Sequence, residues 1–186
     1  MDPISQGTLG GALAQTIANR GNFAKVTLIG FLAGMAPDLD VLIQSNEDPI
    51  LFLEFHRQFT HSLIFIPIGA LIVASALFCF VKKTLTFHVV YLAAFLGYAT
   101  HALLDACTSY GTLLFWPFSN VRIAWNNVSV VDPLFTIPAL ILVICALSLK
   151  KRLYTALALT WCLLYLLLGF IPVSYTHLTL PTSDLV

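Results

Sequence analysis

Residues 85–104 read LTFHVVYLAAFLGYATHALL, an apolar run that Asp105 follows directly. A helix needs about 20 apolar residues to cross the hydrocarbon core of a membrane, with tolerance to roughly 17. The run also carries His101, four residues before Asp105. Ionisable side chains are costly to desolvate at the edge of hydrocarbon, so they are rare there unless they have a function. This stretch therefore predicts a membrane-spanning helix with a candidate site at its end.

Three more stretches are long and apolar enough to cross a membrane. With the first, we expect four long transmembrane helices, at Ser62–Val81, Leu85–Leu104, Pro133–Leu149 and Leu153–Ile171. Two shorter apolar helices are expected before them, at Ile4–Ala18 and Lys25–Ala36. The composition agrees, because 59% of the residues are hydrophobic and only 10% are charged, against about 25% charged residues in soluble domains. The predicted fold is an all-α, polytopic helical bundle in the membrane.

Basic residues predict the orientation of this bundle. Arg20 with Lys25, Lys82 with Lys83, and residues 150–152 fall at alternate connections. If every segment crosses the membrane, they share one side, and loops rich in Lys and Arg stay in the cytoplasm. The opposite side then receives the candidate site residues, which are Asp38, Asp40, His56, His61, His101, Asp105 and Asp132. The formal net charge of zero and the lack of a basic patch give no reason to expect nucleic acid as a partner.

Two segments stand apart from the spans. Residues 107–131 are too polar and broken to cross, and they are rich in Trp, Phe, Gly, Pro and Asn. Tryptophan favours the membrane–water interface, so this segment is either a cap that covers the site or an interfacial loop with no part in it. The Thr/Ser-rich residues 174–186 break from the preceding apolar run. We therefore expect one domain at 1–173 and a foreign or disordered tail at 174–186, and we exclude His177 from the site.

His101 and Asp105 are the first candidate metal ligands. Residues four apart on a helix leave the same face, so the two side chains could bind one ion. An imidazole and a carboxylate in that geometry suit zinc, manganese or iron. The alternative is a His–Asp hydrogen bond at the end of a helix.

Asp38 and Asp40 follow Pro37 at the end of the second short helix. In an extended stretch their side chains point the same way, and two carboxylates placed close together call for a cation or proton between them. Alternatively, the pair caps a short helix at Val41–Gln44.

His56, Arg57 and His61 lead into the first long span. Residues five apart diverge by about 140° on an ideal helix, so joint coordination requires His56 to precede the helix start, with Thr60 or Ser62 as N-cap. Arg57 offers a fork of donors that suits phosphate. The alternative is two interfacial histidines beside an arginine that reaches to water.

Asp132 is the least secure candidate ligand. It precedes Pro133, and Asp at the N-cap followed by Pro at the first helical position is favoured at any helix start. A carboxylate there could still coordinate a metal or orient a ligand histidine.

Several ordered motifs resemble one known family. They are Met1-Asp2-Pro3-Ile4, Ala36-Pro37-Asp38-Leu39-Asp40, His56-Arg57-Gln58-Phe59-Thr60-His61-Ser62, Gly97-Tyr98-Ala99-Thr100-His101-Ala102-Leu103-Leu104-Asp105, Thr108-Ser109-Tyr110-Gly111-Thr112, Trp116-Pro117-Phe118 and Val131-Asp132-Pro133. Over about residues 1–170 the chain resembles the YdjM-like family of bacterial and archaeal inner-membrane proteins, described as membrane-bound metal-dependent hydrolases.

That family is distantly similar to zinc-dependent phospholipase C and the P1-type nucleases, which hydrolyse phosphate esters at a multi-metal centre. The resemblance implies that the seven candidate residues are metal ligands or close supports. It also shows one departure, because many members carry His in the opening D-P-x-x-H, where this chain has Gln6. If that His is a ligand, this site has a weaker or missing metal position.

Together these observations predict a multi-pass membrane hydrolase that uses one or more divalent metals, with zinc expected. Asp38, Asp40, His61, His101 and Asp105 would bind metal, His56 would bind metal or shuttle protons, and Arg57 would hold the substrate phosphate. An outward-facing site in a membrane favours a lipid-like phosphoester as substrate and membrane lipids as partners. Two alternatives stay open. Intramembrane acids and histidines also build metal or proton translocation pathways, and a non-catalytic scaffold could hold a structural metal.

Overall fold

The computed structural model describes residues 1–42 and 57–179, with side chains through residue 171. These residues form six α-helices: α1 (Pro3–Gln15), α2 (Phe23–Met35), α4 (Ile66–Val81), α5 (Phe87–Ala106), α6 (Pro133–Leu149) and α7 (Arg152–Thr179). Three short 3₁₀ helices join them: η1 (Ala36–Leu42), η2 (Phe59–His61) and η3 (Leu63–Phe65). No strand occurs in the described residues, which confirms the predicted all-α bundle.

Three helical segments are long and apolar enough to cross a membrane: Leu63–Val81, Phe87–Ala106 and Arg152–Ile171. The fourth expected span, α6, is an apolar helix of 17 residues, which is at the lower limit for crossing. Helices α1 and α2 have 13 residues each and so extend about 20 Å, short of the roughly 30 Å hydrocarbon core. Helix α7 continues to Thr179, past the expected boundary at residue 173, and the division of the chain there stays a prediction.

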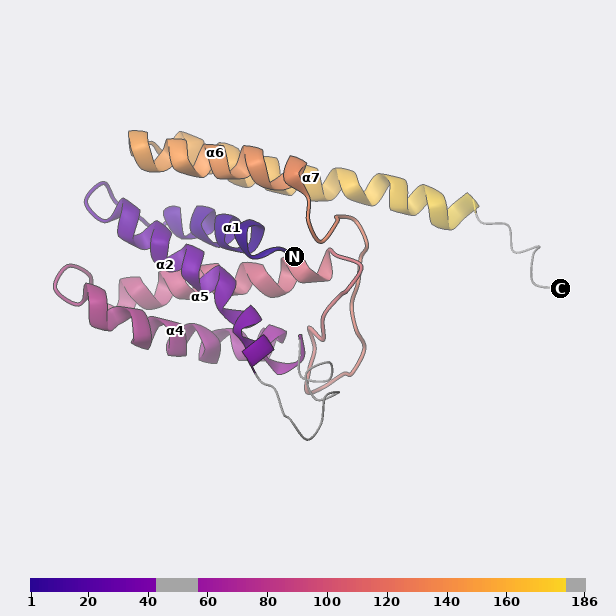
Figure 1. Ribbon diagram of the computed structural model, residues 1–186, viewed down its shortest axis with the longest axis horizontal. Coiled ribbons are helices and arrows are strands. Elements are labelled where there is room, and N and C mark those ends of the chain that lie inside the picture. Colours follow the sequence, from indigo (N-terminus) through magenta and orange to yellow (C-terminus); the bar gives the residue numbers. More distant parts are fainter. Residues whose placement is uncertain (43–56, 180–186) are drawn as a thin grey trace.

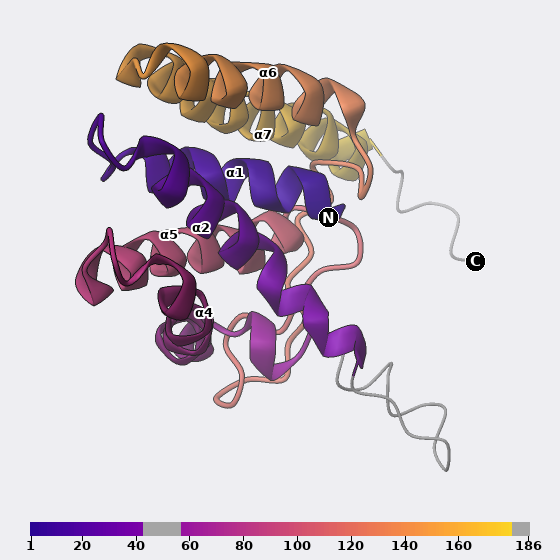
Figure 2. The same ribbon diagram turned by 60° about the vertical axis from the view of Figure 1, so that its left-hand side comes forward.

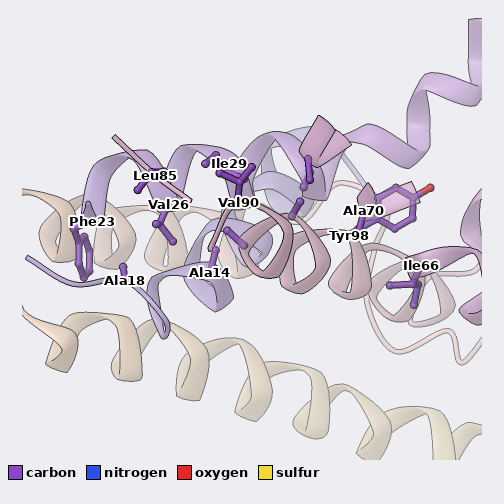
Figure 3. Packing of buried hydrophobic residues seen from close by; sticks show 14 of the residues in the cluster. Ala14, Ala18, Phe23, Val26, Ile29, Ile66, Ala70, Leu85, Val90 and Tyr98 are labelled. Carbon is purple, nitrogen blue, oxygen red and sulfur yellow. The ribbon is translucent and has the colours of Figure 1, made fainter. Parts of the chain in front are cut away.

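The helices form a bundle with α1 inside it. Helix α1 contacts α2 and α5 on one side and the α6–α7 pair on the other, while α4 packs on α5. Figures 1 and 2 show these neighbours from two directions. A buried cluster that includes Ala14, Val26, Ile29 and Val90 fills the space between α1, α2 and α5 (Figure 3).

Glycines let α1, α2 and α5 approach closely. A Cβ atom on Gly10 would lie 2.6 Å from the carbonyl oxygen of Gly30, and a Cβ on Gly97 would collide with the same oxygen. Near the end of α2, a Cβ on Gly34 would lie 2.6 Å from the carbonyl oxygen of Gln6. Small residues at helix interfaces permit such backbone contact in membrane bundles. The close packing brings the start of α1, the end of α2 and the last turns of α5 to one place.

The opposite end of the bundle carries the basic connections between helices. The α1–α2, α4–α5 and α6–α7 connections lie together on the left of Figure 1, away from the N-terminus. Lys25 Nζ donates to Thr84 Oγ1 at 2.7 Å, and Arg152 Nη2 donates to the Ala18 carbonyl at 2.7 Å. The predicted gathering of basic loops on one side is therefore confirmed, and the candidate site lies at the other end.

Candidate metal centre

Four of the expected residues meet at the end opposite the basic loops. Asp38 comes from η1, His61 from η2, and His101 and Asp105 from the last turns of α5. Each offers one ligand atom, and these four atoms all lie within 4.8 Å of one another. The side chains of His61, His101 and Asp105 have no exposed surface, and that of Asp38 is 20% exposed. Segments that are far apart in sequence thus build one buried acidic and imidazole cluster.

The two imidazoles face each other at the centre of the cluster. Their Nε2 atoms are 2.8 Å apart. Asp38 Oδ1 lies 3.3 Å from His101 Nε2 and 3.5 Å from His61 Nε2. Asp105 Oδ2 lies 3.3 Å from His61 Nε2 and 3.6 Å from His101 Nε2. One oxygen from each carboxylate therefore approaches both ring nitrogens.

Hydrogen bonds on the far side of each ring indicate the tautomers. His101 Nδ1 lies 2.6 Å from the Gly34 carbonyl oxygen, which can only accept, so Nδ1 carries the proton. Thr60 Oγ1 donates to Asp40 Oδ2 at 2.9 Å and lies 2.9 Å from His61 Nδ1, so it accepts a proton from that nitrogen. In the neutral form neither Nε2 atom then carries a proton. Two lone pairs at 2.8 Å repel each other unless a cation or a proton lies between them.

The carboxylate oxygens also fit a cation. Within the described part of the chain, Asp38 Oδ1 and Asp105 Oδ2 are buried and accept no hydrogen bond, although buried polar atoms are normally satisfied. Both oxygens face the unprotonated Nε2 atoms of the two rings. Arg57 Nε forms an ion pair with Asp105 Oδ2 at 3.2 Å. Two imidazole nitrogens and two carboxylate oxygens form a donor set that suits zinc, manganese or iron. The cluster could therefore hold a divalent metal ion.

A proton on His61 is the alternative occupant of this centre. Burial by itself lowers the pKa of His61, but the carboxylates of Asp105 and Asp38 outweigh burial and raise it above 6.5. Burial likewise tends to raise the pKa of Asp38, and the two imidazoles outweigh it and hold that pKa well below 3.8. Both shifts express the same electrostatics: the two carboxylates favour a positive charge between them.

Asp40 supports the cluster from outside it. Its Oδ2 accepts from the Arg57 backbone N–H at 3.0 Å and from Thr60 Oγ1, and it lies 3.5 Å from His61 Nδ1. The expectation that Asp38 and Asp40 point the same way is wrong, because η1 is a 3₁₀ helix. With three residues per turn, side chains two apart diverge by about 120°. Asp38 thus faces the ring Nε2 atoms, while Asp40 orients His61 from behind.

Arg57 lies against the cluster. Its side chain is 7% exposed, and Nε lies 3.2 Å from Asp105 Oδ2, although Nε and Nη1 form no hydrogen bond. Its φ is +61°, which is uncommon for residues other than glycine. The guanidinium lies 5.2 Å from the centre of the Tyr110 ring, and the Arg57 carbonyl accepts from the Leu113 N–H at 3.4 Å. Residues 110–113 of the expected cap therefore contact the site.

Asp132 and His56 stand differently from the others. Asp132 is the N-cap of α6, where Oδ1 accepts from the backbone N–H groups of Leu134 and Phe135 at 3.1 and 3.2 Å. Its Oδ2 accepts from the Tyr165 hydroxyl at 2.8 Å, and Asp132 is not part of the four-residue cluster. Asp132 therefore caps a helix, which was the alternative to its role as a metal ligand. His56 lies outside the described residues, as does Gln44 in the alternative in which Asp38 and Asp40 cap a short helix.

Gln6 occupies a position beside the cluster. It is fully buried in α1, and Nε2 donates to Asp105 Oδ1 at 2.9 Å, while Oε1 is buried without a hydrogen bond. The amino group of Met1 also contacts Asp105 Oδ1. Sequence reasoning identified Gln6 as a departure from a family pattern. It missed the roles of the Gly34 carbonyl and of Thr60, for which a hydroxyl next to His61 was the one available signal.

Comparisons with known proteins identify the family of this chain. The uncharacterized protein YfhP of Bacillus subtilis (strain 168) is 29% identical over 111 residues, which are 59% of this chain and 33% of YfhP. The matched stretch thus spans a third of that relative's length. No solved structure matches the chain. The profile of the YdjM inner membrane protein family matches residues 1–178. With its membrane-spanning helices, this chain is a multi-pass inner-membrane protein that belongs to the YdjM inner membrane protein family.

Proposed function

We propose that this protein is a metal-dependent hydrolase that acts on a phosphoester at the non-cytoplasmic face of the membrane. One observation carries the proposal: within the described residues, ligand atoms of two imidazoles and two carboxylates, all within 4.8 Å of one another, converge in a buried centre. A charge-neutral, hydrogen-bonded polar core would not leave these atoms facing one another.

Asp38, His61, His101 and Asp105 would hold the metal, with zinc as the first candidate. A bound divalent cation would supply Lewis acidity, which lowers the pKa of water and polarises a phosphoryl oxygen. The chain itself orients the ligands. Thr60 and Asp40 keep the proton of His61 on Nδ1, and the Gly34 carbonyl keeps that of His101 on Nδ1. Such outer contacts direct the other ring nitrogen toward a metal.

Arg57 would bind the phosphate of the substrate. Among the described residues, its Nε forms an ion pair with Asp105 Oδ2 and its Nη1 is buried without a hydrogen bond, and a guanidinium offers planar paired donors that match phosphate oxygens. The guanidinium lies over the Tyr110 ring, 5.2 Å from its centre. His56, which precedes Arg57 in the chain, keeps its proposed role as a metal ligand or proton shuttle.

The proposal is tested by measuring metal and activity on the same samples. Purified wild-type protein should retain a stoichiometric divalent metal by elemental analysis and should cleave bis(p-nitrophenyl) phosphate. His101→Ala and Asp105→Ala should lose both properties. His88→Ala is the matched control, because His88 is exposed near the other end of α5, and it should keep both. Wild-type protein that binds no metal after reconstitution with zinc, manganese or iron would remove the proposal.

A further inference from the structure

An apolar groove lies beside the candidate metal centre. It has a volume of about 610 Å³ and is lined by residues of α2, η1 and α4, among them Leu32, Met35, Leu39, Ile72 and Leu77. This volume is within the roughly 300–1,000 Å³ of ligand pockets. Among the described residues of its wall, Asp38 is the one with an ionised side chain. The groove is therefore apolar along its length and touches the cluster at a single carboxylate.

A second cavity continues the groove toward the residues behind His61. It has a volume of about 270 Å³ and shares Ala36, Leu39, Ile72 and Val73 with the first cavity. Its wall also includes Asp40 and Thr60. The shared walls make the two cavities neighbours, so apolar space extends beside η1 along the metal centre.

The exposure of the clustered side chains indicates that a ligand reaches the cluster from the side of the groove. Among the four clustered side chains, His61, His101 and Asp105 are fully buried, and only Asp38 has exposed surface. Asp38 is also the member of the cluster that lines the groove. Within the described residues, a molecule that reaches the centre by way of Asp38 therefore passes the groove.

The surroundings of the groove determine what can fill it. Helix α4 belongs to a membrane-spanning segment, and Leu32, Leu39 and Ile72 on the groove wall are 39%, 62% and 60% exposed. In a bilayer these side chains face hydrocarbon, where lipid tails are the abundant apolar chains. A flexible tail suits a long apolar channel that has a charged group at one end.

We propose that the groove between α2 and α4 binds an acyl chain of a lipid phosphoester, which enters sideways from the membrane and presents its phosphate at Asp38. This inference rests on the proposed hydrolase activity for the cleavage of the phosphoester. The binding of the acyl chain in the groove does not depend on that activity. Because Asp38 and Asp105 would repel a phosphate, the headgroup needs the cation in the centre, whereas the acyl chain does not.

Binding of the acyl chain in the groove can be measured without any catalytic activity. The full-length protein is reconstituted in phosphatidylethanolamine and phosphatidylglycerol vesicles that contain a phosphatidylcholine with a diazirine near the ester end of one acyl chain. After irradiation, labelled residues are mapped by mass spectrometry. Residues of the groove wall such as Met35 and Leu39 should be labelled more heavily than Leu134 and Ile141, which are 71% and 54% exposed on α6.

A blocking variant with a matched control sharpens the test. Ala76→Trp places a large side chain in the groove and should reduce labelling of Met35 and Leu39 about tenfold, because displacing two methylene groups costs roughly that much affinity. Ser75→Trp is the control, since Ser75 is a neighbouring exposed residue of α4 outside the groove wall. Equal labelling of the groove and α6, or equal loss in both folded variants, would overturn the inference.

An activity measurement separates this inference from the proposed function. In zinc-loaded protein, Ala76→Trp should slow cleavage of a diacyl phospholipid about tenfold, for the same loss of chain contact, and leave cleavage of bis(p-nitrophenyl) phosphate unchanged. An equal loss with both substrates contradicts a chain-binding groove. If wild-type protein cleaves neither substrate, the hydrolase proposal fails, while the labelling pattern still decides the groove.

Discussion

The Nε2 atoms of His61 and His101 lie 2.8 Å apart, and each ring carries its proton on the opposite nitrogen, where Thr60 Oγ1 and the Gly34 carbonyl accept it. This relationship calls for a positive charge at the centre. A bound cation would supply it, and so would a proton on His61, whose pKa the carboxylates of Asp105 and Asp38 raise.

Replacement of Asp40 should weaken metal binding without abolishing it. Asp40→Asn removes the charge that, through Thr60, holds the proton on His61 Nδ1, and loss of such outer support costs about 10–100-fold in metal affinity. Isothermal titration with zinc measures the change. Asp132→Ala should leave the affinity unchanged and lower stability by about 1 kcal/mol, as expected for loss of a helix cap. Zinc affinity that falls with Asp132→Ala would instead make Asp132 a ligand.

Metal affinity should rise with pH through the region above pH 6.5. The carboxylates raise the pKa of His61 above 6.5, and the ring must lose its proton before Nε2 can bind metal. In the metal-free protein the trend is reversed. A raised folded-state pKa contributes stability below 6.5 that is lost as pH rises through the folded pKa. Melting temperatures with and without zinc, measured across this pH range, should therefore diverge, and parallel curves would contradict this account.

Gln6→His should strengthen metal binding. Gln6 is buried with its amide against Asp105, so an imidazole at this position would add a nitrogen donor beside the cluster. We expect an increase in zinc affinity of about tenfold, or roughly 1.4 kcal/mol. Gln15→His is the control, because Gln15 is a buried glutamine of the same helix that contacts Thr155 and the Val143 carbonyl instead. An increase in both variants would point to nonspecific binding by the added histidine.

Arg57→Lys should impair cleavage while metal stays bound. Lysine keeps the positive charge near Asp105 but lacks the paired donors of the guanidinium. Loss of one donor to a developing phosphoryl charge typically costs about a hundredfold or more in rate. Steady-state kinetics and metal content are measured together, with Arg122→Lys as control, because Arg122 is exposed and, among the described residues, donates to the carbonyls of Tyr110 and Gly111. Unchanged cleavage in Arg57→Lys would exclude the phosphate role.

Gly97→Ala should destabilise the protein and loosen the centre. The new Cβ would collide with the Gly30 carbonyl and force α5 away from α2, at a cost of about 1–3 kcal/mol for overpacking. The displacement would also separate His101 from Gly34. Thermal denaturation in detergent and zinc titration test both effects. Gly21→Ala serves as control, since its Cβ would lie an ordinary 3.6 Å from Asn19 Oδ1. A Gly97→Ala protein with unchanged stability would show that the helices can separate freely.

The sequence by itself determined the helices, their membrane location and the pairing of His101 with Asp105. Apolar runs, alternating basic loops and a spacing of four residues act locally, so each can be deduced without knowledge of the partner segments. The tertiary structure decided among the seven candidates: Asp38 and His61 join that pair, Asp40 supports it from outside, and Asp132 caps α6. The physical reason is that glycine-mediated helix contacts and the 3₁₀ turn after Pro37 set the direction of each side chain, and those contacts join residues that are distant in the chain.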